Sequence, residues 1–145
     1  MRLAFSRFGE GNASNVIILH GLLGSKRNWF GVGKALSDIG FNVWLLDLRN
    51  HGDSEWNDKH TYFDLAEDVK KFFEEHGIIS SFLIGHSMGG KTAMLLSLLK
   101  PELIDQLIIS DISPKDYQSK AEVRKIAEGL MNLNLDRIEK RKDLD

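Results

Sequence analysis

The sequence predicts an α/β fold in which a parallel sheet carries helices on both faces. Four short runs of consecutive apolar residues alternate with segments of helical periodicity. Continuous apolar runs are typical of parallel strands that are buried on both faces. Strand and helix in regular alternation indicate the crossover connections of such a sheet. A chain of 145 residues is sufficient for one domain with a hydrophobic core.

The first half of the chain supplies two of the buried strands. Residues 2–8 form a short edge strand, and residues 16–19 form the first buried strand. Residues 28–39 predict a helix, which Gly40 ends because glycine readily adopts the backbone conformation found after a helix C-terminus. Residues 43–46 form the second buried strand.

The second half repeats the pattern. Residues 64–76 predict a helix, because their apolar side chains recur at the spacing of one helical face. Residues 82–84 form the third buried strand, and the helix that opens at Met88 stops before Pro101. Residues 107–109 form the fourth buried strand.

The character of the sequence changes after Pro114. A capping box at residues 119–122 precedes a run with helical spacing, and no further strand pattern follows. We therefore divide the chain into a core of strands and helices at residues 1–114 and a helical region at residues 115–145.

The most informative motif, Gly85-His86-Ser87-Met88-Gly89-Gly90, lies between the third buried strand and the helix after it. Strand, Gly-x-Ser-x-Gly and helix is the context of a nucleophile elbow, a strained turn that projects a serine hydroxyl above the sheet. Side chains at Gly85 or Gly89 would crowd this turn. Ser87 is therefore the candidate nucleophile.

Two further motifs precede the elbow at regular spacing, and a fourth short motif follows it. These motifs are His20-Gly21-Leu22-Leu23-Gly24-Ser25, Asp47-Leu48-Arg49-Asn50-His51-Gly52-Asp53-Ser54, and Asp111-Ile112-Ser113-Pro114. Together with the elbow they resemble the α/β-hydrolases, and their residues are similar to those of the YbfF-like bacterial esterases and their mitochondrial relatives. The resemblance covers about residues 15–117. It implies an α/β-hydrolase core that contains the strands up to the family's sixth and lacks the last two, with residues 115–145 as the beginning of a helical cap.

The oxyanion donors follow from the two turns and from the resemblance. The elbow supplies the backbone N–H of Met88, and the loop after the first buried strand supplies that of Leu22. Asp111 is the candidate triad acid, because it follows a strand at the sheet edge where α/β sites are built, and the YbfF-like resemblance places the acid here. Other α/β-hydrolases place the acid after the next strand, and Asp111 would then only cap a turn.

The sequence contains no histidine in the position expected for the catalytic base. A serine hydrolase needs a histidine, yet all five histidines precede Ser87, and the resemblance places the triad histidine beyond this chain. His20 should order its loop, and His86 should project away from the serine. Arg49 and Asp53 are expected to brace the loop of the second motif.

Composition limits the partners, the cellular location and the cofactors that we expect for this protein. The net charge is −2 with no basic stripe, so nucleic acid is not an expected partner. There are no cysteines, no signal peptide and no apolar run long enough for a membrane span, which together predict a cytoplasmic protein. No histidines have the spacing of metal ligands, and we expect neither a metal nor a cofactor.

These observations predict a serine carboxylic-ester hydrolase, an esterase or thioesterase that forms an acyl-enzyme at Ser87 with a small-molecule ester or thioester. Residues 1–145 alone should be inactive without the base. Two alternatives stay open: an amide or carbon–carbon bond hydrolase with the same constellation, and a noncatalytic fragment or binding-only homologue. The strand at residues 107–109 should present an open sheet edge through which the chain self-associates.

Overall fold

The computed structural model describes residues 1–145 except 10, 12–13, 116–124, 126–127 and 130–145. The chain divides into two compact units, Met1–Pro114 and Lys115–Asp145. All helices and strands named below belong to the first unit. The predicted capping box at residues 119–122 and most of the predicted cap lie outside the described residues.

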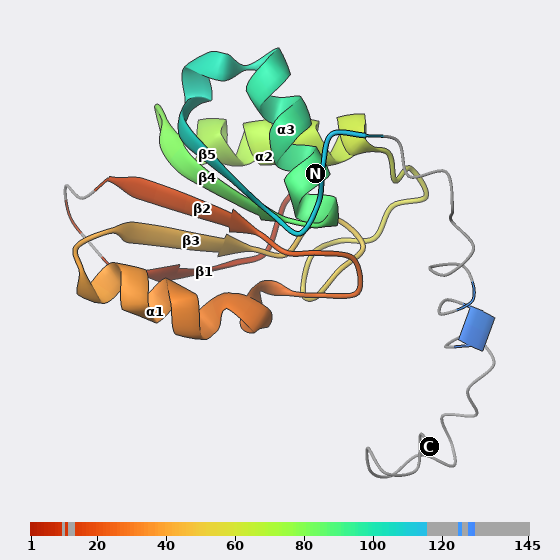
Figure 1. Cartoon of the computed structure of the whole chain (residues 1–145), viewed down its shortest axis with the longest axis horizontal. Helices are drawn as coiled ribbons and strands as arrows, with labels where there is room; N and C mark the ends of the chain where they lie inside the picture. Colours follow the sequence, from red (N-terminus) through yellow and green to blue (C-terminus); the bar gives the residue numbers. More distant parts are fainter. Residues whose placement is uncertain (10, 12–13, 116–124, 126–127, 130–145) are drawn as a thin grey trace, which may run out of the picture. The chain divides into compact units, whose positions relative to one another are not determined.

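A five-stranded sheet with the order β1-β3-β2-β4-β5 forms the centre of the first unit. β1 pairs antiparallel with β3, and the other neighbours pair in parallel. The carboxyl ends of the four parallel strands therefore meet at one edge of the sheet, where the connecting loops gather (Figure 1). The strands are β1 (Phe5–Phe8), β2 (Asn15–Leu19), β3 (Asn42–Leu46), β4 (Ser81–His86) and β5 (Ile104–Ser110).

Helices cover both faces of the sheet, as predicted. Figure 1 shows α1 on one face and α2 with α3 on the other. Within the part of the chain that the structure describes, no helix combines the length and the apolar character needed to cross a membrane. The α-helices are α1 (Phe30–Asp38), α2 (Tyr62–Glu75) and α3 (Met88–Leu99), and two 3₁₀ turns span Lys26–Trp29 and Pro101–Leu103.

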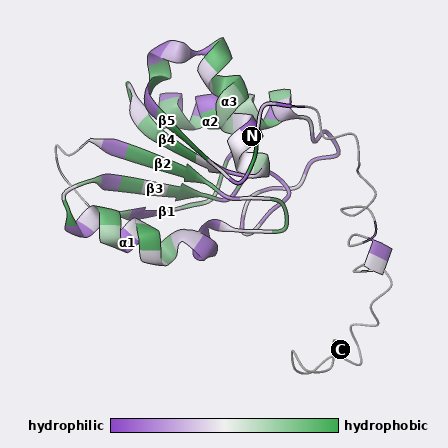
Figure 2. Cartoon of the chain, viewed as in Figure 1, coloured by the Kyte–Doolittle hydropathy of each residue, from purple (hydrophilic) through white to green (hydrophobic). Residues whose placement is uncertain are grey.

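The buried strands contribute side chains to two separate cores. In β2, Ile17 and Leu19 pack into the cluster on the side of α2 and α3, whereas Val16 and Ile18 pack into the cluster that contains Leu36 of α1. The strand is thus buried on both faces, which confirms the interpretation of the continuous apolar run. Figure 2 shows the same hydrophobic character along the inner strands.

The structure corrects two details of the sequence interpretation. The edge strand begins at Phe5, because Ala4 is already bonded through its N–H to Ser54 Oγ and through its carbonyl to the N–H of Asp47. The segment at residues 28–39 is not one helix, since a 3₁₀ turn precedes α1.

Candidate active site

Ser87 occupies the tightest junction in the sheet edge. It is the single residue between β4 and α3, and its backbone angles are φ 49° and ψ −113°. A residue with a side chain rarely adopts this region, and holding it there costs about 1–3 kcal/mol. The strained turn that the Gly-x-Ser-x-Gly motif predicts is thus confirmed.

The glycines of the motif are required by close backbone contacts. A Cβ at Gly85 would lie 2.5 Å from the carbonyl oxygen of Gly89, and a Cβ at Gly89 would lie 2.6 Å from that of His20. The Gly89 N–H also donates to the His20 carbonyl at 3.1 Å, an ordinary hydrogen-bond distance. α3 can therefore begin directly against the end of β2.

The loop after β2 lies against the side chain of Ser87. A Cβ on Gly21 would sit 2.8 Å from His86 Nδ1 and 3.2 Å from the Ser87 Cβ, so a side chain at this position would crowd both residues. The loop then turns back on itself: the Gly24 N–H donates to the Gly21 carbonyl at 3.0 Å, and Leu23 has a left-handed φ of 60°. Leu22, at the tip of this turn, is the residue that follows the contact with Ser87.

The backbone donors that follow Leu22 in this loop all have acceptors. The N–H groups of the four residues from Leu23 to Lys26 donate to His51 Nε2, Gly21 O, Asn28 Oδ1 and Asp47 Oδ1. The hydrogen bonds among the described residues include none from the N–H of Leu22 or from that of Met88. Both groups are therefore available to a developing oxyanion beside Ser87.

Asp111 lies next to Ser87 along the sheet edge. β4 and β5 pair His86 with Ser110, and the Ser87 N–H donates to the Ser110 carbonyl at 3.0 Å. Asp111 has a φ of 55°, and its side chain is 84% exposed. Its Oδ2 lies 3.6 Å from His86 Nε2. The carboxylate thus stands at the same edge as the serine and is open to a further partner.

Two of the histidines have both ring nitrogens engaged. His20 Nδ1 donates to the Gly21 carbonyl at 2.8 Å, and its Nε2 accepts from the Leu48 N–H at 3.0 Å. Burial lowers the pKa of His20, which keeps the ring neutral and suits this arrangement. His51 is likewise held between the Arg49 carbonyl and the Leu23 N–H. His20 orders its loop, as the sequence predicts.

A family model described as the alpha/beta hydrolase fold matches residues 15–134. The chain belongs to the α/β-hydrolase fold family. The strained serine, the adjacent loop after β2 and the mostly parallel sheet are thus features of an α/β-hydrolase core.

Relatives of this α/β-hydrolase include lipases and esterases. The chain is 40% identical over 107 residues to the sn-1-specific diacylglycerol lipase ABHD11 of Mus musculus, a match that covers 73% of this chain and 35% of that protein. A probable alcohol acetyltransferase of Saccharomyces cerevisiae is 41% identical over 122 residues, with 81% and 36% covered. A solved marine microorganism esterase aligns with a TM-score of 0.90 and 38% identity, covering 98% of this chain and 55% of its own. The chain therefore spans about a third of these curated relatives and about half of the solved esterase.

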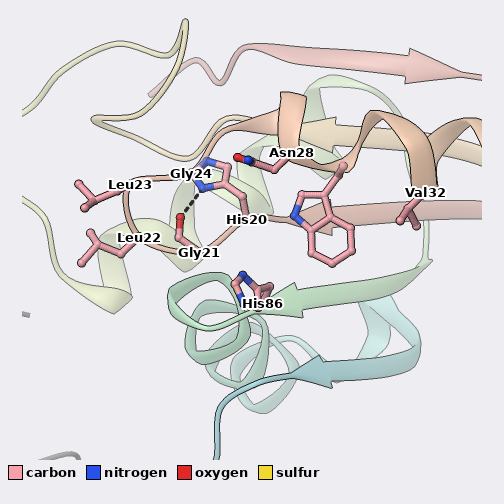
Figure 3. Close-up of a pocket in the computed structure, with 9 residues that line it drawn as sticks. His20, Gly21, Leu22, Leu23, Gly24, Asn28, Val32 and His86 are labelled. Atoms are coloured by element: carbon pink, nitrogen blue, oxygen red, sulfur yellow. Dashed lines mark hydrogen bonds between the residues drawn. The ribbon is translucent and has the colours of Figure 1, made fainter. Parts of the chain in front are cut away.

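A hollow of about 530 Å³ opens beside the loop after β2 of the α/β-hydrolase core. Its walls include Leu22, Trp29, Val32 and His86, so most of its surface is apolar. Figure 3 shows His86 facing the loop, with Leu22 and Leu23 at the outer end of the turn. Trp29 lies beside this loop and forms part of the apolar wall of the hollow.

The loop after β3 is braced by ionic hydrogen bonds. Arg49 donates from Nε to the buried Asp68 carboxylate at 2.6 Å and from a terminal nitrogen to the Lys59 carbonyl at 2.7 Å. Asp53 accepts from Lys26 Nζ. The bracing roles predicted for Arg49 and Asp53 are therefore confirmed.

Sequence reasoning missed Lys26 and Asp47, which form a buried ion pair between the loops after β2 and β3. Burial raises the pKa of the Asp47 carboxyl, but hydrogen bonds from the Lys26 ammonium and from two backbone N–H groups outweigh it, so the pKa lies below the ordinary 3.8. Burial likewise lowers the pKa of Lys26, and its two carboxylate partners raise it above 10.5. Only the position of Asp47 at a strand end could have signalled this pair.

Proposed function

We propose that the protein containing this chain is a serine carboxylic-ester hydrolase, an esterase or thioesterase that forms an acyl-enzyme at Ser87. The observation that carries the proposal is the strained Ser87 backbone beside a loop whose Leu22 N–H is not used within the described residues. A strained nucleophile next to preorganised donors is the arrangement that acyl transfer requires. The similarity to lipases and esterases supports the same class.

In the proposed reaction, Ser87 Oγ attacks the carbonyl carbon of an ester or thioester. The N–H groups of Leu22 and Met88 stabilise the resulting oxyanion, and a histidine outside residues 1–145 takes the Oγ proton and returns it to the leaving group. Asp111 accepts a hydrogen bond from that histidine and fixes its tautomer. Water then attacks the acyl-enzyme, and the acid product leaves while Ser87 regains its proton.

A second candidate is transfer of the acyl group to an alcohol instead of water. The similarity to the probable alcohol acetyltransferase supports it, since both reactions share the acyl-enzyme. Product analysis with an acetyl ester in the presence of ethanol separates the two: ethyl acetate indicates transfer, and acetate indicates hydrolysis.

The test is turnover of short p-nitrophenyl esters by the full-length protein. Ser87→Ala should lower kcat on the order of 10⁶-fold, by analogy with the loss of the nucleophile in another serine hydrolase. Ser37→Ala, an exposed serine of α1 that donates to the Lys34 carbonyl, is the control and should retain full activity. Equal activity of Ser87→Ala and wild type would contradict the proposal.

The substrate class is resolved by the leaving group. Ester and thioester turnover without cleavage of the corresponding p-nitroanilide supports the proposed class, whereas anilide cleavage would assign an amide hydrolase. No turnover of any of them by the full-length protein would favour a binding-only homologue.

We expect residues 1–145 alone to be inactive and to self-associate. β5 has one neighbour in the sheet, and its Leu107 and Ile108 are 36% and 52% exposed. An apolar edge strand pairs readily with another chain. Sedimentation should show oligomers of this segment, and a monodisperse monomer with full Ser87-dependent turnover would overturn both expectations.

A further inference from the structure

A buried group of charges joins the loop after β2 to the loop after β3. Because the loop after β2, residues 20–25, contains Leu22, we call it the oxyanion loop of the proposed reaction. Lys26 follows the oxyanion loop directly, and its ammonium contacts the carboxylates of Asp47 and Asp53. We name these three residues the carboxylate clamp. Asp47 is fully buried and Lys26 is nearly so, whereas Asp53 is 64% exposed.

The clamp holds backbone as well as side chains. Asp47 Oδ1 accepts the Lys26 N–H at 2.7 Å, and Asp47 Oδ2 accepts the Asp53 N–H at 2.9 Å. One carboxylate therefore fixes a backbone atom in each of the two loops. Gly52 packs so closely on Asp47 that a Cβ there would overlap the carboxylate, so any side chain at this position would displace it.

The segment after β3 also forms hydrogen bonds with the tip and the start of the oxyanion loop. The Leu23 N–H donates to His51 Nε2 at 3.3 Å, and His20 at the other end of the loop accepts from the Leu48 N–H at 3.0 Å. The loop is thus fixed at its start, tip and end by residues that follow β3. Leu22 lies between the first two of these attachments.

From this arrangement we infer that Lys26 and Asp47 are positioning residues that set the placement of the Leu22 N–H against Ser87. This inference rests on the proposed function. Neither side chain contacts the substrate in the proposed reaction. Both act through the backbone of the oxyanion loop. A donor that is misplaced by about 1 Å can cost about 10²-fold in rate, because stabilisation of an oxyanion depends steeply on geometry.

The first arm of the test measures kcat and KM of the full-length protein with p-nitrophenyl acetate, normalised to active sites titrated with a fluorophosphonate. Lys26→Met keeps an unbranched side chain of nearly the same length and removes its charge. We expect kcat to fall about 10- to 100-fold with KM within about twofold of wild type. Lys34→Met, which removes an exposed lysine paired with Asp38 on α1, is the matched control and should change neither.

A gentler variant covers the case in which Lys26→Met does not fold. Asp53→Ala removes the exposed carboxylate of the clamp and leaves the buried pair intact. We expect a fall in kcat of about two- to fivefold, again without a change in KM. Unchanged kcat per titrated site in both variants, with only a lower melting temperature, would overturn the inference and leave the clamp a purely structural feature.

The second arm does not depend on activity. Hydrogen exchange of the backbone amides of residues 23–26 should become at least 10-fold faster in the folded Lys26→Met protein and about two- to fivefold faster in Asp53→Ala, while exchange in α2 and α3 stays as in wild type. Unchanged exchange at residues 23–26 would overturn the inference. If the wild type hydrolyses no ester but exchange accelerates as expected, the proposed function fails while the clamp's hold on the loop stands.

Discussion

Two aspartates directly follow parallel strands of this sheet, and their surroundings are opposite. Asp47, after β3, is fully buried, and its carboxylate accepts from the Lys26 ammonium and from two backbone N–H groups. Asp111, after β5, is 84% exposed, and the imidazole of His86 lies 3.6 Å from it. A carboxylate whose oxygens are all engaged can hold loops together but cannot orient a mobile base. An accessible one beside the nucleophile can.

The comparison also separates two halves of the site. In the half built by the loops after β2, β3 and β4, the Lys26 ammonium is paired with two carboxylates and the N–H groups of residues 23–26 all donate hydrogen bonds. The half at β5 exposes both Asp111 and apolar residues of the strand. The first half is preorganised within the described residues, and we propose that the second is completed by the triad histidine.

The largest effect on activity is expected when the exposed carboxylate of Asp111 is removed. Asp111→Asn in the full-length protein should lower kcat about 10⁴-fold, because the triad histidine loses the group that fixes its tautomer. Since the side chain is exposed, the free energy of unfolding should change by no more than about 0.5 kcal/mol. Ester turnover and urea titration check both values. Wild-type kcat in Asp111→Asn would assign the acid to a residue after a later strand.

The opposite pattern is expected at Asp47. Asp47→Asn should lower the free energy of unfolding by about 3–5 kcal/mol, because Lys26 then remains buried without its charged partner. Asp38→Asn is the matched control: it removes an exposed partner of Lys34 and should change stability by less than about 1 kcal/mol. Chemical denaturation of the three proteins decides the point, and equal stability of Asp47→Asn and wild type would refute the structural role.

The packing around Asp47 gives a smaller, sharper comparison. Gly52→Ala and Gly77→Ala both place a side chain at a left-handed backbone, with φ of 54° and 62°. Only the Cβ at Gly52 overlaps the Asp47 carboxylate, whereas that at Gly77 meets open space. We expect Gly52→Ala to destabilise by about 1–3 kcal/mol more than Gly77→Ala. Equal melting temperatures of the two variants would show that the carboxylate can move aside.

The smallest expected effect is a pH dependence that Asp47 alone confers. Its folded pKa is depressed below 3.8, so its stabilisation is complete above that value and is lost as the pH falls through 3.8 toward the folded pKa. Between about pH 4 and pH 3, wild type should lose up to about 1 kcal/mol more stability than Asp47→Asn. Urea titrations at several pH values measure the slope, and parallel curves for the two proteins would contradict the lowered pKa.

Much of the fold could be predicted from the sequence, because the information is local. Continuous apolar runs gave the buried strands, and the glycines of the elbow gave the strained Ser87. The antiparallel pairing of β1 could not be predicted, since nothing in residues 5–8 specifies a neighbour 35 or more residues away. The ion pair of Lys26 and Asp47 was missed for the same reason: it joins residues 21 apart whose roles depend on how two loops fold together.

The candidate site residues also differ in whether local sequence or a distant partner determines their role. Ser87, Leu22 and Met88 are placed by backbone geometry that short motifs encode, and the structure provides the strained turn and the unused donors among the described residues. The role of Asp111 depends on a partner that local pattern does not specify, and it stays a prediction.

The central claim is that Ser87 is an activated nucleophile, and covalent labelling tests it most directly. The full-length protein is incubated with a fluorophosphonate, which reacts with activated serines, and its intact mass and labelled peptide are determined. We expect one label per chain at Ser87 and no label on Ser87→Ala. An unlabelled wild type, or a label that persists at another residue in Ser87→Ala, would contradict it.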